Sequence, residues 1–184
     1  KFNQDLRNWD TSNVGSNYDS FGKGSKICNS PYCNLPRKFS TEIACGQKSA
    51  ALTDTTIHKA VNKYLSNQCT EYGPMKYWDT SKVTNMSLLF RDKGSFNEDI
   101  SGWNVSMVKS FNFMFSGATK FNQPLKSWNV LNATNMIYMF NHAENFNQDL
   151  SNWNTSKVNS YDSFGENAPI CNNSYCNLPR KFNI

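Results

Sequence analysis

A tryptophan that returns at one constant interval limits what this chain can fold into. An interval of 25 residues separates Trp78, Trp103, Trp128 and Trp153. The remaining tryptophan, Trp9, stands in a matching phrase. That phrase reads FNQDLRNWDTSNV around Trp9 and FNQDLSNWNTSKV at the other end of the chain. A fixed period of about 20 to 50 residues is typical of a repeat architecture, in which each repeat buries its apolar face against its neighbours.

Within each repeat the apolar residues stand at constant places. One copy carries Ile100, Trp103, Val105, Val108, Phe111, Met114 and Phe115, and the next carries Leu125, Trp128, Val130, Ala133, Met136, Met139 and Phe140. The two-residue step from Trp103 to Val105 predicts a short strand, and the three-residue steps from Val108 onward predict a helical turn. We therefore predict an α/β repeat solenoid, leucine-rich-repeat-like, with short parallel strands on one face and short helices on the other.

One segment breaks the period. Residues 52–66 read LTDTTIHKAVNKYLS, and they place five apolar side chains on one helical face: Ile57, Ala60, Val61, Tyr64 and Leu65. Thr53 or Asp54 is expected to cap the start of this helix. We interpret the segment as a lid on the first coil, because the end coil of a repeat stack has no neighbour to cover it.

A second, longer duplication frames the chain. Residues 28–39 read CNSPYCNLPRKF and residues 171–182 read CNNSYCNLPRKF. The expected organisation is therefore a window of a tandem array. It comprises the last coil and cysteine loop of one unit (1–39), a linker and capping helix (40–77), a four-coil solenoid (78–165), and a cysteine loop followed by the start of the next linker (166–184).

The six cysteines predict disulfide bonds. If the two cysteine loops are equivalent, each must close on itself, because no cysteine follows Cys176. This argument pairs Cys28 with Cys33 and Cys171 with Cys176, and it leaves Cys45 to pair with Cys69. Pairing between molecules is the alternative. A zinc site is disfavoured, because two ligands in each loop leave the metal under-coordinated.

Five Asn-x-Ser/Thr sequons favour an extracellular glycoprotein. They start at Asn85, Asn104, Asn132, Asn154 and Asn172. The net charge is +5, but the basic residues are scattered without a stripe or a nucleic-acid-binding motif, so we expect no nucleic-acid partner. No apolar run long enough for a membrane span is present in the sequence.

The segment FNEDISGWNVSMVKSFNFMFSGATKFNQPLKSWNV resembles the 25-residue surface-protein repeat of bacterial adhesins and mycoplasma-type lipoproteins, which also occurs in microbial eukaryotes. The segment LTDTTIHKAVNKYL followed by MKYWDTSKVTNM resembles the usual start of such arrays. The resemblance covers residues 1–21 and about 52–165. It implies a fold grouped with leucine-rich repeats and a place at the cell surface.

The sequence offers no catalytic, cofactor or metal motif, and we predict that the protein is not an enzyme. His58 and His142 are expected to be surface residues. Asp5, Asp99 and Asp149 could form a calcium ladder, but Pro124 interrupts it, so we interpret these aspartates as corner turns. The recurring corner asparagines are expected to form a ladder between coils: Asn3, Asn97, Asn122 and Asn147.

The expected function is an extracellular structural or adhesive protein, a segment of a tandem filament or surface fibre. The alternative is a recognition module that binds a protein or glycan on its strand face, where Asn104, Asn129 and Asn154 stand. The coil at residues 1–21 lacks a preceding neighbour, so its core residues Leu6, Trp9 and Val14 should bind a coil of another segment or copy. Such a head-to-tail contact would produce a filament.

Overall fold

The computed structural model describes residues 51–66, 72 and 74–171, with the backbone alone at Cys171. Contacts divide the chain into two compact units. One unit comprises Lys1–Ala50 and His58–Trp78, and the other comprises Ala51–Ile57 and Asp79–Ile184. The described elements are helix α2 (Asp54–Leu65) and two 3-10 helices, η2 (Met75–Tyr77) and η3 (Pro169–Cys171).

Helix α2 confirms the helix predicted over residues 52–66. Its first turn is fixed by threonines: the Thr56 N–H donates to the Thr53 carbonyl (3.0 Å), and the Thr53 N–H donates to the Thr56 hydroxyl (2.9 Å). The reciprocal bond supplies a partner to a backbone group that the helix itself leaves unpaired. The predicted apolar face is buried at Ile57, Ala60 and Val61.

In the first unit, two tyrosine rings pack on Trp78. The Tyr64 ring meets the indole edge-on at 5.7 Å, and the Tyr72 ring is tilted against it at 5.9 Å. Trp78 is buried, and its backbone N–H donates to the carbonyl of Met75 at the start of η2. Trp78, the last residue of this unit, is therefore packed against two tyrosine rings.

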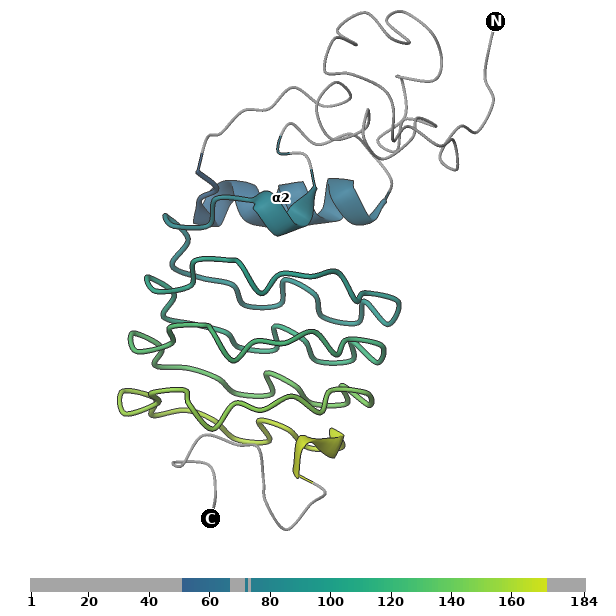
Figure 1. Ribbon diagram of the computed structural model, residues 1–184, viewed down its shortest axis with the longest axis vertical. Helices are drawn as coiled ribbons and strands as arrows, with labels where there is room; N and C mark the ends of the chain where they lie inside the picture. The colour runs from purple at the N-terminus through teal and green to yellow at the C-terminus, as the bar shows by residue number, and fades with distance from the viewer. Residues whose placement is uncertain (1–50, 67–71, 73, 172–184) are drawn as a thin grey trace, which may run out of the picture. The chain divides into compact units, whose positions relative to one another are not determined.

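The second unit is a stack of coils, which Figure 1 shows lying one upon the next. We number the coils by residues: coil 1 is 79–102, coil 2 is 103–127, coil 3 is 128–152 and coil 4 is 153–171. Residues one period apart occupy equivalent places, as the parallel backbone bridges between Asn85 and Ser110, Ser110 and Asn135, and Asn135 and Ser160 demonstrate.

Stacked phenylalanine rings fill the interior. One column places Phe90 on Phe115 (5.5 Å between ring centroids), and Phe115 on Phe140 (5.3 Å). A parallel column runs through Phe96, Phe121 and Phe146, with spacings of 5.4 and 5.7 Å. All of these rings are buried, and each contributes about 1.5–3 kcal/mol through burial, so the aromatic columns stabilise the stack.

The predicted burial of the repeating apolar positions is confirmed at every position named for coils 2 and 3. Trp103 and Trp128 are 3% and 4% exposed. Trp128 stacks in parallel on Trp153 at 6.3 Å, and its indole N–H donates to the carbonyl of Ile100 near the end of coil 1 (3.3 Å). This tryptophan therefore ties neighbouring coils together by packing and by a hydrogen bond.

Backbone hydrogen bonds join neighbouring coils along what we call the edge lane, residues 86–92 and their equivalents at 111–117, 136–142 and 161–167. Every second N–H in this lane donates to the next coil, to the carbonyl of the residue just before its own equivalent. In coil 2 the donors are Phe111, Phe113, Phe115 and Gly117, whose N–H groups point to the carbonyls of Asn135, Ile137, Met139 and Asn141 at 2.8–2.9 Å. The direction is the same at each junction between coils.

The predicted strands and short helices are wrong. The described residues hold no β-strand, and their parallel pairing is limited to the isolated bridges; within coils 1–4, the only helical element is η3. The three-residue spacing arises from consecutive turns, in which Met114, Ser116 and Ala118 donate to the carbonyl three residues earlier. A left-handed residue between these turns prevents the backbone from continuing as a helix. The structure is therefore a stack of turn-rich coils.

The start of the stack is closed by a side chain. In coils 3 and 4, paired N–H groups donate back to one carbonyl of the preceding coil, as Thr134 and Asn135 do to Lys109. At coil 1 the equivalent donors, Thr84 and Asn85, instead meet the Asp54 carboxylate at 2.7 and 3.0 Å. Asp54 thus takes the place that a backbone carbonyl of the preceding coil has at the later junctions.

Candidate interaction surface

One corner of the stack is held by an amide ladder, as predicted from the repeated asparagines. The Asn97 side-chain oxygen accepts from the Asn122 N–H (3.0 Å) and from the Gln123 side-chain amide (3.0 Å). One coil later, Asn122 accepts in the same way from Asn147 (3.0 Å) and from the Gln148 side chain (2.8 Å). These asparagines therefore satisfy corner backbone groups and have a structural role.

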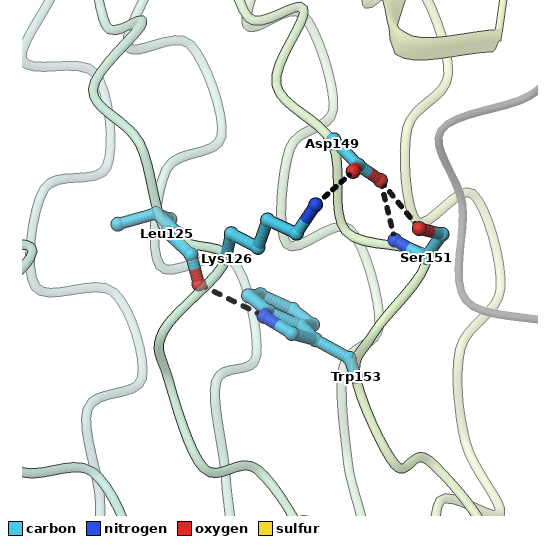
Figure 2. A network of polar contacts seen from close by, with 5 residues as sticks. All are labelled: Leu125, Lys126, Asp149, Ser151 and Trp153. Carbon is cyan, nitrogen blue, oxygen red and sulfur yellow. Dashed lines mark hydrogen bonds and ion pairs between the residues drawn. The ribbon is translucent and has the colours of Figure 1, made fainter.

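The predicted aspartate corner turns are also present. Asp99 accepts from the Ser101 N–H at 3.0 Å, and Asp149 accepts from the Ser151 N–H at 2.9 Å. Figure 2 shows that Asp149 also binds the Lys126 ammonium of the preceding coil (2.8 Å), beside the bond from the Trp153 indole to the Leu125 carbonyl (2.9 Å). The Lys126 hydrogen bond, followed by the Ser151 bonds, holds the pKa of the Asp149 carboxyl well below its ordinary value.

Left-handed backbone recurs in two columns along the edge lane. One column has positive φ at Asp92 (56°), Gly117 (70°), His142 (55°) and Asn167 (61°). Asp, Asn, His and Gly are the residues that adopt this conformation most readily, so the column explains why a histidine stands at 142. His142 is exposed, as predicted, and its ring lies within 3.4 Å of the Asn167 side-chain nitrogen.

The second left-handed column carries bulky residues. Leu88, Phe113, Tyr138 and Ser163 have φ between 48° and 64°. This conformation is rare for a large side chain and costs about 1–2 kcal/mol per residue. A strained backbone that holds large side chains at the surface is a candidate for function. We call Leu88, Phe113 and Tyr138 the apolar row.

The apolar row places one partly exposed apolar or aromatic side chain on each of three coils. Leu88 is 47% exposed, and Phe113 and Tyr138 are half-buried. The Phe113 and Tyr138 rings stack at 4.7 Å, and the Arg91 guanidinium lies over the Phe113 ring at 5.0 Å from its centroid. Beside the row in sequence, the Asn112 side-chain oxygen is buried and has no hydrogen-bond partner among the described residues. The apolar row can therefore pack against an apolar or planar group.

The asparagines of the predicted strand face form a repeated turn. Asn104, Asn129 and Asn154 are exposed, and each side-chain oxygen accepts from the N–H two residues later, at 3.1–3.2 Å. Their uniformity therefore reflects a repeated Asx turn. Exposed Met107 and Leu131 lie nearby in sequence, in coils 2 and 3 respectively.

The sequon asparagines among the described residues differ in the hydrogen bonds that their side chains make. Asn85, Asn104 and Asn154 are exposed and use the side-chain oxygen to accept from their own turn. Asn132 is half-buried: its side-chain nitrogen donates to the Ser106 carbonyl at 2.9 Å, and its oxygen accepts from Lys157 at 2.9 Å. Asn132 is therefore built into the contact between coils.

Comparison with known families identifies the chain. The family model described as "Mycoplasma protein of unknown function, DUF285" matches residues 1–35 and 59–177. The chain belongs to this family. A search of curated proteins and a search of solved structures each found no match.

The described residues of this DUF285 member contain neither a metal-ligand cluster nor a membrane-spanning helix. Among them, no group of three or more His, Cys, Asp or Glu side chains could hold a metal ion. No helix in the described part is both long and apolar enough to cross a membrane.

Several predicted site residues lie outside the described residues. They are Leu6, Trp9, Val14, Cys28, Cys33, Cys45, Cys69, Cys176 and Asn172, together with the cysteine loops that hold some of them. Cys171 closes η3, and its side chain is likewise outside the description. The disulfide and assembly predictions therefore stay predictions.

Sequence reasoning missed the apolar row. Its members stand one period apart, so a column-by-column comparison of the repeats would have found Leu, Phe and Tyr at one place in the repeat, each followed by a buried residue. It also missed Asp54 as the closing residue of the stack, because nothing in the local sequence links residue 54 to residues 84 and 85.

Proposed function

We propose that this protein is an extracellular structural or adhesive repeat protein, a segment of a tandem filament or surface fibre. One observation carries the proposal: each coil meets the next through the same set of contacts, between residues that occupy the same places in every repeat. Because every coil has the same contact surface, coils can be added one after another at a regular spacing, as a structural fibre requires.

The proposed extracellular location has its support in the sequence. The predicted disulfides suit an oxidising compartment, and three of the described sequons have exposed asparagines, at 85, 104 and 154. The resemblance to surface-protein repeats favours the same location. We propose no catalytic role for this chain.

Assembly is proposed to run head to tail. The phrase at residues 2–21 repeats that of residues 146–164, and a single coil cannot bury its own apolar face. Leu6, Trp9 and Val14 are therefore proposed to pack on a coil of an earlier segment or a neighbouring copy. A contact between two different surfaces repeats without closing, so it yields a filament.

Negative-stain electron microscopy of the native material tests this function. We expect fibres with a regular repeat, and we expect a Trp9→Asp variant to give short or isolated particles. The Leu131→Asp variant, which alters an exposed residue of coil 3, serves as the control and should leave the fibres intact. Isolated particles from the native protein would exclude the filament.

A recognition role is the second candidate, because the apolar row keeps bulky residues in a strained conformation at the surface. The partner would be a protein or glycan that contacts Leu88, Phe113 and Tyr138. Replacing all three by asparagine should relieve backbone strain and abolish binding to that partner. Binding that survives this change would remove the apolar row as the recognition site.

A further inference from the structure

The two ends of the edge lane carry opposite hydrogen-bonding groups of the backbone, N–H donors in coil 4 and carbonyl acceptors in coil 1. In coil 4, the backbone N–H groups of Ser163, Gly165 and Asn167 continue the donor series, and they find no acceptor within the described residues. In coil 1, the carbonyls of Ser87, Leu89 and Arg91 stand where an earlier coil would donate, and the described residues supply no donor. One end of the lane therefore presents donors, and the other end presents acceptors.

These two ends match in register. At each junction the donor binds the carbonyl of the residue just before its own equivalent, as Leu88 binds Asn112 and Phe113 binds Ile137. The same rule assigns Ser163 to the position of Ser87, Gly165 to that of Leu89, and Asn167 to that of Arg91. Along this lane, coil 1 of a second copy would therefore bind coil 4 in the register that a following coil of the same stack would have.

Charge supports the same register. Residues 91, 116, 141 and 166 share one place in the repeat, and the Asn141 side-chain nitrogen approaches the Glu166 carboxylate at 3.5 Å across a junction. In the next junction, Glu166 would face Arg91 of the second copy. Both side chains are exposed, and Arg91 lies 3.4 Å from Asp92 in its own coil, so the new contact would bring a second carboxylate to the guanidinium.

We propose that the edge lane is a docking edge through which coil 4 of one copy binds coil 1 of a second copy. The proposal rests on the proposed filament function and adds a contact to it. The contact spans Ser87 to Arg91 on one copy and Ser163 to Asn167 on the other, and it covers the exposed Leu88 side chain. It starts beyond Thr84 and Asn85, whose N–H groups are already bound by Asp54.

A second copy fits this edge better than the chain's own first segment does. The phrase Tyr18-Asp19-Ser20-Phe21-Gly22 matches the sequence from Tyr161 to Gly165, but Lys23 follows it where Glu166 stands in coil 4. A lysine at this place would repel Arg91. The opposite charges required for the contact are therefore found between coil 4 of one copy and coil 1 of another.

Sedimentation velocity of the full 184-residue chain tests the contact, at concentrations up to about 1 mM because three backbone bonds and an ion pair form a small interface. We expect association that grows with concentration. Arg91→Glu alone and Glu166→Arg alone should each lower the association constant about tenfold, since attraction becomes repulsion. The double variant and an equimolar mixture of the two single variants should both recover it.

Two controls make the result specific. Glu98→Lys and Lys109→Glu change exposed charges outside the edge lane and should leave association unchanged. Hydrogen exchange supplies a second measurement: the amides of Ser163, Gly165 and Asn167 should slow as concentration rises. Absence of self-association, no effect of either single reversal, or unchanged exchange at these amides would overturn the proposal.

The outcome also separates this contact from the filament itself. Native fibres that survive Arg91→Glu but are lost in Trp9→Asp would refute the docking edge and keep the proposed function. Native material without fibres would refute the proposed function, even if the chain associates weakly at high concentration.

Discussion

At the scale of single residues, Gly117 is where the left-handed edge lane tolerates the least change. Its φ is +70°, and a Cβ at this position would lie 2.6 Å from the Asp92 carboxylate oxygen. Gly117→Ala should therefore lower the free energy of unfolding by about 1–2 kcal/mol, through backbone strain and crowding. Urea denaturation measures this change.

The same place in coil 3 supplies the control for that experiment. His142 has φ +55°, and glycine adopts this conformation without strain. His142→Gly should leave the free energy of unfolding unchanged or raise it. If Gly117→Ala were as stable as the wild type, the left-handed column would not constrain the sequence.

Side-chain hydrogen bonds predict which sequons can be modified. If the protein is made in cells that add N-glycans, we expect occupancy at Asn85, Asn104 and Asn154 and little at Asn132, whose nitrogen donates to Ser106. Intact-glycopeptide mass spectrometry measures the occupancy of each site. Full occupancy at Asn132 with empty Asn104 and Asn154 would contradict the hydrogen-bond argument.

The pair formed by Lys126 and Asp149 predicts a dependence on pH. The pKa of Asp149 is lowered in the folded chain, so its stabilising contribution is complete above the unfolded pKa of about 3.9 and is lost as pH falls toward the lower folded pKa. Lys126→Met removes the largest cause of the shift. Its stability deficit relative to the wild type should shrink below about pH 4.

Urea titrations of both proteins at several pH values measure this deficit, with Lys120→Met, an exposed lysine outside the pair, as the control. Both side chains of the pair are substantially exposed, at 55% and 40%, so the deficit should be small at neutral pH. A deficit that grows in acid would contradict the assignment.

At the scale of elements, the start of α2 closes the stack through one carboxylate. Asp54→Ala leaves the Thr84 and Asn85 N–H groups without their acceptor and should lower the free energy of unfolding by about 2 kcal/mol, because bonds to a charged group are lost. Amide exchange at Thr84 and Asn85 should quicken, and Asp54→Asn should be intermediate.

Lys59→Ala, a change at an exposed position of the same helix, separates the closing role from helix stability. It should alter neither the unfolding free energy nor the exchange at Thr84. Unchanged exchange in Asp54→Ala would show that these amides do not depend on the carboxylate.

The elements also show what the sequence could and could not predict. The buried positions followed from the period, because a residue that recurs in every repeat meets its own copy in the next coil; Trp128 and Phe115 lie where this argument places them. The backbone conformation between these buried positions could not be predicted from the period. Phe113 and Tyr138 adopt a left-handed conformation that residues of their type rarely take, so three-residue spacing was interpreted as a helix instead of a series of turns.

At the scale of the whole molecule, each coil depends on its neighbours. Trp128 in coil 3 packs on Trp153 in coil 4 and bonds to Ile100 in coil 1, so it contacts residues on both sides of its own coil. Trp128→Ala should lower the free energy of unfolding by about 3–5 kcal/mol, because the cavity opens between coils that cannot close it. Calorimetry should show a lower melting temperature and a broader transition as coupling between coils weakens.

Leu131→Ala, at an exposed position in the same coil, is the matched control and should melt like the wild type. Melting of Trp128→Ala that equals the wild type would contradict the stacked arrangement. A loss confined to coils 3 and 4, detected by hydrogen exchange, would show that the coils unfold in separate groups.

The single direction of the edge-lane hydrogen bonds gives the stack an electrical polarity. The peptide dipoles of this lane are aligned, with partial negative charge at the carbonyls of Ser87, Leu89 and Arg91 and partial positive charge at the amides of Ser163, Gly165 and Asn167. Arg91 stands at the negative end, where it also pairs with Asp92 (3.4 Å), and Glu166 stands at the positive end. A rod built from such coils would have two electrically different tips, and growth at one tip would be faster at low salt than at high salt.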